Sequence, residues 1–288
     1  MSATRAIRVA EAGGASVAHR HHRPRWPMTI LGILFLSIMI FPVYWMINTS
    51  LQAQAGAATV TWFPFQPTFA GYIGAIQDQG QNLVTSIIVA LGTVVVTLVV
   101  ATPAAYGLGR FKMPGMPVFL FVLLITQMIP TIVIANALYT LFNDIGLLNN
   151  YLGLILADSA AQIPFAVLLI RAFITSIPQS LVEAALVDGA NNLRAFISIV
   201  VPISRNAIIT AALFTFLGAW GDFLFALTLT SKPDVRPVTL GIYNYLSSNV
   251  QNWGPVMATA VLASLPAAVL LILAQRYIAA GAIGGAIK

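Results

Sequence analysis

The stretch Leu83–Tyr106 reads LVTSIIVALGTVVVTLVVATPAAY and contains no charged side chain. A run of about 18 or more apolar residues is long enough to cross a bilayer as a helix. Similar runs recur along the chain, and only Asp158 and Asp222 interrupt them. No period-two alternation typical of a barrel runs through them. The sequence therefore predicts an all-α polytopic membrane protein with six transmembrane helices, the other five being Met28–Ile47, Pro117–Phe142, Tyr151–Ile170, Asn206–Thr230 and Pro255–Gln275.

The composition indicates the same class. Of the 288 residues, 59% are hydrophobic and 8% are charged, against roughly half and a quarter in soluble domains. A soluble globule cannot bury so much apolar surface. The chain has no cysteine, which excludes disulfides and thiol chemistry. The net charge of +6 fits the basic cytoplasmic loops of a membrane protein better than a nucleic-acid partner.

The positions of lysine and arginine predict the orientation, because these residues concentrate in cytoplasmic loops. If the N-terminus is cytoplasmic, only Lys232 and Arg236 of the 14 basic residues lie outside. Both termini are therefore expected in the cytoplasm. The twelve residues on that side are Arg5, Arg8, Arg20, Arg23, Arg25, Arg110, Lys112, Arg171, Arg194, Arg205, Arg276 and Lys288.

The same pattern divides the chain. We expect a basic cytoplasmic tail (1–27), a first transmembrane helix (28–50), an external segment (51–82), a five-helix core (83–275) that includes a cytoplasmic loop (171–205), and a cytoplasmic C-terminal tail (276–288). The alternative at the N-terminus is a cleaved signal peptide, since Ala53-Gln54-Ala55 resembles a cleavage site. An uncleaved helix is favoured, because the apolar run is longer than a signal core.

Five of the expected helices contain a proline, which removes a backbone donor and tends to kink a helix. These kinks fit a bundle of bent helices around a path, and they equally fit the ordinary tolerance of membrane helices for proline. The five are Pro42, Pro103, Pro130, Pro164 and Pro266.

Several chemistries are missing from the sequence. No lysine follows a glycine, so the chain has no Gly-Lys-Ser/Thr loop for the phosphates of ATP. All three histidines, His19, His21 and His22, lie in the N-terminal tail, so a histidine base or metal cluster inside the membrane is excluded. The tail fits a basic anchor near anionic lipid, with a metal-binding tract as the alternative. We expect no enzyme activity, cofactor or metal on this chain.

The cytoplasmic loop carries a helix-turn-helix pattern. Ser180 and Glu183 have the spacing of a capping box, which predicts a helix starting near Leu181. Gly189 permits a turn at the end of that helix. A second helical stretch, Asn192–Val201, is expected to end at Pro202.

The loop is also expected to expose Leu186, Val187 and Phe196. Exposed apolar side chains next to one acid are typical of a docking site for another protein. The alternative is a well-packed loop whose small residues serve only close approach.

Glu183-Ala184-Ala185, Gly189 and Pro202 resemble the EAA loop of importer permeases of the ATP-binding-cassette (ABC) class. The resemblance covers Leu31–Lys288 and is greatest to MalG-like carbohydrate permeases. One departure is Trp220-Gly221-Asp222-Phe223, where the family usually has Trp-Asn-Glu-Phe. Further matching motifs are Ile177–Leu181, Asp188–Ala190, Ala105–Phe111, Gly146–Asn150, Gln275–Tyr277 and Gly284–Lys288.

The resemblance implies the fold of a type I ABC importer permease in a bacterial inner membrane. It implies a second homologous permease, two ATPase subunits that hold ATP and Mg, and an extracytoplasmic sugar-binding protein. Glu183 would pair with a basic group of the ATPase. The implied coupling residues are Glu183, Ala184, Ala185, Leu186, Val187, Asp188, Gly189, Ile199 and Pro202. The alternative function is an ion-driven secondary transporter, although no internal repeat or buried ion pair supports it.

Polar side chains within membrane helices are expensive and often functional, and amides, acids and aromatic rings suit a sugar path. Their alternative role is to hold helices together, and the two acids also fit wetted helix ends. The candidates are Gln127, Asn136, Tyr139, Asp158, Gln162, Trp220 and Asp222.

The external segment 231–254 is expected to meet the binding protein, with an interfacial aromatic belt as the alternative. Its candidate contact residues are Asn244, Tyr245, Asn249, Asn252 and Trp253.

Topology reporters will test the orientation. Reporters within 108–116 and 171–205 should show a cytoplasmic location, and those within 51–80 and 231–254 an external one, because of the twelve-to-two division of basic residues. A cytoplasmic signal from 231–254 would show that the helix count is wrong.

Overall fold

The computed structural model describes residues 26–286 except 54, 57–59, 112 and 248–251. Every regular element in these ranges is a helix. The chain forms two units, Met1–Trp45 and Met46–Lys288. The described part of the first unit belongs to helix α1 (Trp26–Ser50), which contains Pro42. Because α1 is apolar on all sides, it has the composition of a helix surrounded by lipid.

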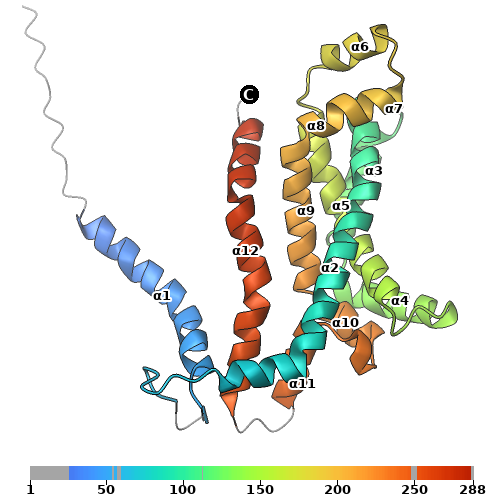
Figure 1. Ribbon diagram of the computed structural model, residues 1–288. Helices are drawn as coiled ribbons and strands as arrows, with labels where there is room; N and C mark the ends of the chain where they lie inside the picture. Colours follow the sequence, from blue (N-terminus) through green and yellow to red (C-terminus); the bar gives the residue numbers. More distant parts are fainter. Residues whose placement is uncertain (1–25, 54, 57–59, 112, 248–251, 287–288) are drawn as a thin grey trace, which may run out of the picture. The chain divides into compact units, whose positions relative to one another are not determined.

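The second unit contains the remaining helices (Figure 1). In chain order they are α2 (Ala70–Arg110), α3 (Met116–Thr126), α4 (Thr131–Asp144), α5 (Tyr151–Ile174), α6 (Gln179–Val187), α7 (Asn192–Ala195), the π-helix η1 (Phe196–Val200), α8 (Val201–Ile203), α9 (Arg205–Trp220), α10 (Leu224–Leu229), the 3-10 helix η2 (Pro233–Val235), α11 (Val238–Ser247) and α12 (Trp253–Ala286).

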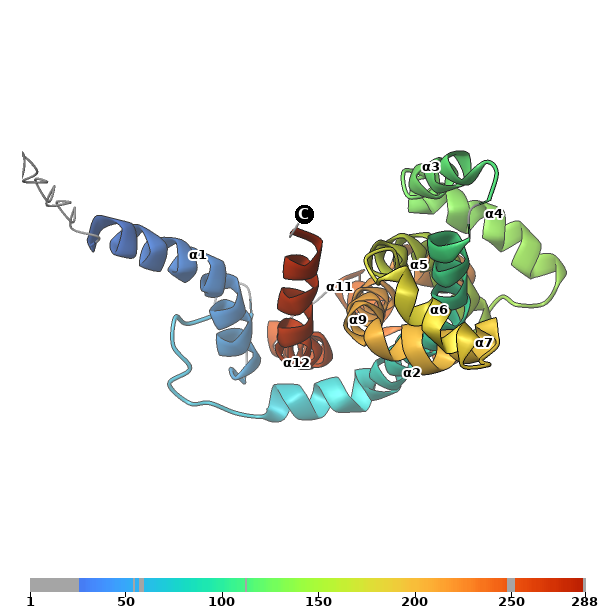
Figure 2. The ribbon, with the colours of Figure 1, turned by 90° about the horizontal axis from the view of Figure 1, so that it is seen from above.

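The core of this unit forms where α2 packs against α5, α9 and α12. Figure 2 looks down on α2, α5 and α9 gathered together, with α3 and α4 to one side. Fully buried alanines lie at these contacts, namely Ala101, Ala105, Ala166 and Ala211. Small side chains let helix backbones approach closely, which supplies the packing that hydrophobicity cannot supply between helices in lipid.

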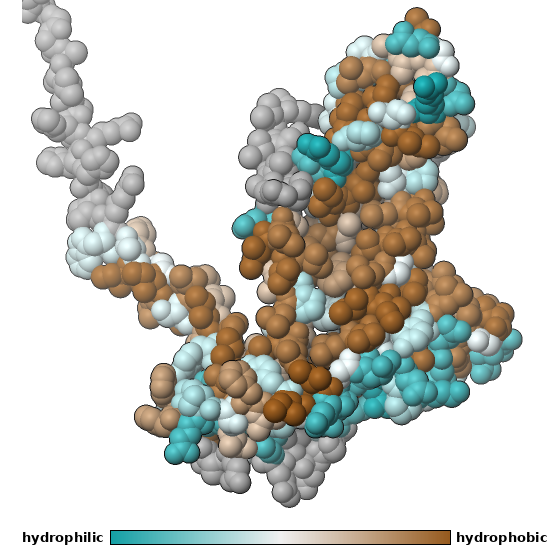
Figure 3. All heavy atoms as spheres, viewed as in Figure 1, coloured by the Kyte–Doolittle hydropathy of each residue, from teal (hydrophilic) through white to brown (hydrophobic). Residues whose placement is uncertain are grey.

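Among the described residues, four helices are long and apolar enough to cross a membrane without interruption. Two bent helix pairs raise the number to six if each pair is one span. The four are Met28–Ser50, Ala70–Arg110, Tyr151–Ile174 and Trp253–Gln275. Apolar side chains cover the length of the unit in Figure 3, and polar residues gather towards its two ends. We call these ends the α6 end and the α11 end.

The expected transmembrane helix Pro117–Phe142 is interrupted, because the chain breaks after Thr126 and bends by 93° between α3 and α4. Pro130 precedes α4 with φ −58° and ψ 130°, an extended conformation. Proline also lacks the amide that would continue the α3 ladder. The helix therefore restarts at Thr131 in a new direction.

The expected helix Asn206–Thr230 is also interrupted. Helix α9 ends at Trp220 and α10 starts at Leu224, while the preceding helical stretch bends by 76° before Arg205. Helix α2, in contrast, starts at Ala70 and reaches into the expected external segment 51–82. Its 41 residues correspond to roughly 61 Å, about twice the hydrocarbon thickness.

The extension of α2 is held by polar contacts at the α11 end. Gln79 and Asn82 are buried, and the Asn82 amide donates a 2.6 Å hydrogen bond to Gln79. A Cβ added at Gly241 of α11 would lie 2.2 Å from Oε1 of Gln79, so α11 packs directly on these amides. Ser86 Oγ accepts a 2.8 Å bond from the Val238 amide. Contacts with α11 thus satisfy the polar residues of α2, so that this helix extends beyond its apolar run.

Gly153 will test the packing at the start of α5. A Cβ at Gly153 would lie 2.2 Å from the carbonyl oxygen of Leu147, whereas a Cβ at Gly107 of α2 meets nothing within 4 Å. Gly153→Ala should therefore lose about 1–3 kcal/mol through overpacking. Gly107→Ala should be neutral or stabilising, because alanine is the better helix former. Thermal unfolding of the purified chain in detergent measures both, and equal melting temperatures would contradict the close approach.

Candidate coupling loop and translocation cavity

The segment Ile177–Ser204, which contains α6 and α7, forms the α6 end of the molecule (Figure 1). Helix α6 ends in a Schellman motif. The Gly189 amide donates to the Leu186 carbonyl at 3.1 Å, and the Ala190 amide donates to the Ala185 carbonyl at 2.9 Å. Gly189 has φ +86°, a conformation that glycine adopts without penalty. The turn predicted at Gly189 is confirmed.

The start of α6 differs from the expected capping box. The helix begins at Gln179 after Pro178, and no side chain caps it. Pro178 is the N-cap residue, with φ −54° and ψ 132°, so Ser180 already lies inside the first turn. Glu183 instead accepts a 2.8 Å hydrogen bond from the amide of Gln179. Within the described residues, Gln179 is the hydrogen-bond partner of Glu183, and no ion pair is found there.

A buried apolar cluster holds this segment on the membrane helices. Val182 of α6 and Val200 of η1 are buried together with Tyr106 of α2 and Ile174 of α5. The Phe196 ring lies 4.9 Å from that of Tyr106, so Phe196 is half-buried and its predicted exposure is wrong. The segment is therefore packed on the ends of α2 and α5.

Other apolar side chains of the segment are exposed. Leu186 and Val187 are 41% and 87% exposed, as expected. Leu193 and Ile197 are 64% and 56% exposed, and the sequence analysis missed both. Their i, i+4 spacing in a helical stretch was the available signal, since it puts two apolar residues on one face. Glu183 and Ala184 are also exposed, while Ala185 packs partly on the cluster.

The second helical stretch continues past its predicted end. The Asn191 side chain accepts a 2.8 Å bond from the Arg194 amide and starts α7. The helix widens into η1 and then includes Pro202 within α8 before ending at Ser204. A π-helical turn accommodates a residue without a donor. Of the remaining loop candidates, Ile199 is half-buried, while Asp188 and Pro202 are exposed.

The break between α3 and α4 borders a cavity of 400 Å³ against α5. Gln127 lies at the end of α3 and Gln162 on α5, and both line this cavity. The structure thus brings together two of the seven candidate path residues. Asn136 and Tyr139 are exposed on α4 and do not line it.

Trp220 and Asp222 both make hydrogen bonds to backbone groups that hold neighbouring helices in place. The buried Trp220 donates from Nε1 to the Ala263 carbonyl of α12 at 3.0 Å and stacks on Phe216. The Asp222 carboxylate accepts from the amides of Phe225 at 3.3 Å and Ala226 at 3.0 Å. These are free donors of the first turn of α10, so Asp222 fixes where the helix restarts.

Asp158 on α5 is only 3% exposed, so the interpretation of a wetted helix end is wrong for it.

The external candidates are partly occupied by internal contacts. Asn252 accepts from the amides of Ala55 at 3.1 Å and Gly254 at 3.0 Å, so it ties the chain after α1 to the start of α12. The hydroxyl of Tyr245 donates to Asp78 of α2. Burial, followed by this bond, raises the pKa of Tyr245 to about 12.

Among the other external candidates, Asn244 and Trp253 are half-buried. Asn249 lies outside the described residues.

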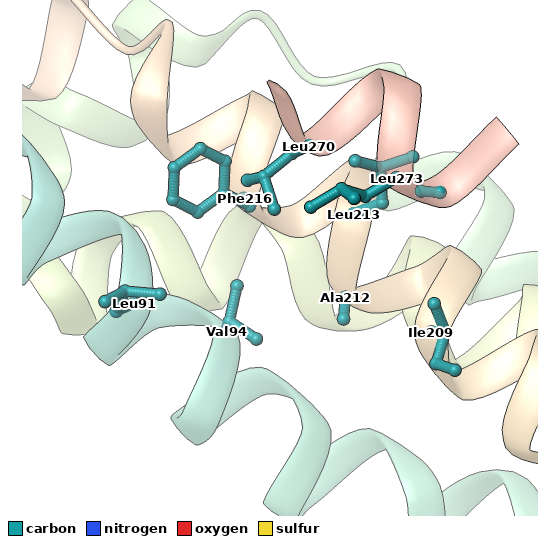
Figure 4. A pocket seen from close by; sticks show the side chains of 9 residues that line it. Leu91, Val94, Ile209, Ala212, Leu213, Phe216, Leu270 and Leu273 are labelled. Carbon is teal, nitrogen blue, oxygen red and sulfur yellow. The ribbon is translucent and has the colours of Figure 1, made fainter. Parts of the chain in front are cut away.

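A second pocket, of 280 Å³, lies among α2, α9 and α12 (Figure 4). Its walls are hydrocarbon throughout, from residues such as Leu91, Leu213 and Leu270. A polar solute would find no hydrogen-bond partner on these side chains, so this pocket is unsuited to a sugar.

Comparison with known proteins adds to this geometry. Residues 101–283 match the family described as "Binding-protein-dependent transport system inner membrane component". The sulfoquinovosyl glycerol transport permease of Agrobacterium fabrum is 31% identical, over 86% of this chain and 89% of that protein. The trehalose transport permease of Mycobacterium tuberculosis is 31% identical, over 90% and 96%. The diacetylchitobiose uptake permease DasC of Streptomyces coelicolor is 29% identical, over 91% and 96%.

Solved structures share the fold. A bacterial ABC transporter involved in alginate import matches with a TM-score of 0.73 and 22% identity, over 88% of this chain and 98% of that chain. The MetNI methionine ABC transporter matches with a TM-score of 0.53 and 15% identity, over 72% and 95%.

Substitutions at Asp222 will test its structural role. Asp222→Ala removes both acceptors for the α10 amides and should lower stability by about 1 kcal/mol. Asp222→Asn keeps one acceptor and should lose less. Thermal unfolding in detergent gives the comparison, and an alanine variant as stable as the wild type would show that the carboxylate does not hold α10.

Proposed function

We propose that this chain, which belongs to the binding-protein-dependent family of inner-membrane transport components, is the permease subunit of a sugar importer. The chain is a multipass membrane permease with the fold of ABC importers, and it works in a complex with other subunits. The similar folds are ABC transporters, so the ion-driven secondary transporter is set aside. A sugar substrate is supported by relatives named for trehalose, diacetylchitobiose and sulfoquinovosyl glycerol.

The proposed complex contains a second homologous permease, two ATPase subunits with ATP and Mg, and an extracytoplasmic sugar-binding protein. Both termini and the α6 end face the cytoplasm. In Figure 1 the C-terminal end of α12 lies at the same end of the second unit as α6, as a shared side for these two parts requires. The aromatic side chains of Trp62, Phe63 and Phe65 are exposed at the α11 end, where aromatic residues suit the membrane interface or a protein contact.

One observation carries the coupling proposal. The segment Ile177–Ser204 exposes apolar side chains on one side and is packed on the membrane helices by others. Leu186 and Val187 are available to an ATPase, while Val182 and Val200 fix the same segment to α2 and α5. A docked ATPase that moves this segment would therefore move those two helices as a rigid body, which is the requirement for alternating access. Glu183 supplies a charge beside the apolar contact.

Gly189→Val will test the coupling. Its Cβ meets nothing within 4 Å, so the penalty is conformational, about 1–2 kcal/mol at positive φ, and the segment should be reoriented. We expect a chain that still inserts in the membrane but loses the ATPase in co-purification, or loses sugar-stimulated ATP hydrolysis in proteoliposomes.

Gly115→Val is the matched control. Gly115 has φ +78° with the same open surroundings, but it precedes α3 and lies outside the proposed docking segment. This variant should carry a similar stability loss and retain the ATPase. If Gly189→Val binds the ATPase and supports uptake at the wild-type rate, the segment is not the coupling element.

A further inference from the structure

The cavity at the α3–α4 break contains unused hydrogen-bonding groups. Within the described residues, the side chains of Gln127, Gln162 and Thr131 line it and have no hydrogen-bond partner. Thr126 also lines the cavity, but its hydroxyl already donates to the Leu123 carbonyl at 2.8 Å. Two amides and one hydroxyl therefore face a 400 Å³ space with their donors and acceptors free.

The depth of the cavity indicates that it is wet. Helix α3 has 11 residues and is about 16 Å long, roughly half of a hydrocarbon core of about 30 Å. Non-helical backbone at such a depth is tolerated where it is buried in protein or lines an aqueous cavity. Amide side chains facing hydrocarbon would be costly, whereas a water-filled path would solvate them.

The position of Gln162 is set by α9. A Cβ added at Gly218 would lie 2.0 Å from Nε2 of Gln162. The amide thus lies directly over a position where the neighbouring helix has no side chain. Gly218 therefore leaves space on α9 for the amide end of Gln162, and a side chain at position 218 would displace that amide.

We propose that this cavity is a subsite for an uncharged, hydroxyl-bearing unit of the transported sugar, bound by the amides of Gln127 and Gln162 and the hydroxyl of Thr131. The inference rests on the proposed sugar-importer function. Amides donate and accept together, which matches sugar hydroxyls. The residues that line the cavity carry no charge, and the nearest acid along α5 is Asp158, one turn from Gln162. Anionic sugars should therefore be disfavoured.

Single-cysteine labelling gives the test, because the natural chain contains no cysteine. Gln127→Cys and Gln162→Cys are made in the full complex and labelled with a charged, membrane-impermeant maleimide. Glucose, trehalose and diacetylchitobiose serve as uncharged ligands, and lactobionate serves as the anionic one. We expect the reagent to label both cysteines. The labelling rate should fall several-fold in the presence of at least one uncharged sugar, and lactobionate should leave the rate unchanged.

Two further variants make the result specific. Asn136→Cys replaces an amide on α4 outside the cavity, and sugar should not change its labelling rate. Gly218→Ala should displace the flexible end of Gln162 without unfolding the chain. Combined with Gln127→Cys, it should weaken the protection by sugar. Gly107→Ala is the control for an added methyl group in open space.

Three results would overturn the subsite. They are failure of the charged reagent to reach positions 127 and 162, absence of protection by any uncharged sugar, and equal protection at position 136, which would indicate a global change. The proposed function is scored separately by uptake and ATPase co-purification. If the complex imports sugar but sugar does not slow the labelling of position 162, only the subsite is contradicted. If sugar slows the labelling but the chain neither binds an ATPase nor imports sugar, only the proposed importer function is contradicted.

Discussion

The need to satisfy backbone hydrogen bonds inside a bilayer is the constraint on which the rest of this structure depends. Continuous helices meet it without help, and the long helices α2, α5 and α12 do so. The chain leaves helical geometry within its apolar stretches at two places, before Pro130 and after Trp220. Each break requires other groups to replace the lost partners. At the second break the Asp222 carboxylate accepts from the amides that start α10. At the first, the amides of Gln127, Met128 and Ile129 bond back to the carbonyls of Leu124, Ile125 and Thr126 in tight turns.

Rigid connection of the α6–α7 segment to the membrane helices is the second requirement of the proposed coupling. The cluster of Tyr106, Ile174, Val182 and Val200 joins the α6–α7 segment to the two helices with the most extensive mutual packing, α2 and α5. Arg171 adds a 3.0 Å bond from its Nε to the Leu108 carbonyl near the end of α2. Packed interiors transmit displacement because they deform little. A force applied to α6 would thus reach the helices that border the cavity through α5, which carries Gln162.

The sequence predicted the features that depend on composition and local conformation. Charge-free runs predicted the membrane class and the all-α fold, which the comparisons confirm. Gly189 predicted a turn because positive φ is a property of one residue. The break at Pro130 was missed because this proline has the same sequence signal as Pro103, Pro164 and Pro266, which lie inside helices. Whether a proline kinks or ends a helix depends on the tertiary partners of the freed groups, and these are absent from the local sequence.

The hydrogen bonds of the candidate polar residues, rather than their residue types, distinguish those that stabilise the fold from those that remain available to a ligand. Trp220 and Asp222 were candidate path residues like the glutamines, and Asn252 was a candidate contact for the binding protein. Each makes hydrogen bonds that hold two parts of the fold together. Gln127 and Gln162 make no such bond among the described residues. A polar group that stabilises the fold is satisfied without ligand, whereas one that binds ligand must remain available until the ligand arrives. Free hydrogen-bonding groups beside a cavity are therefore what separates Gln127 and Gln162 from the other polar candidates in the proposed subsite.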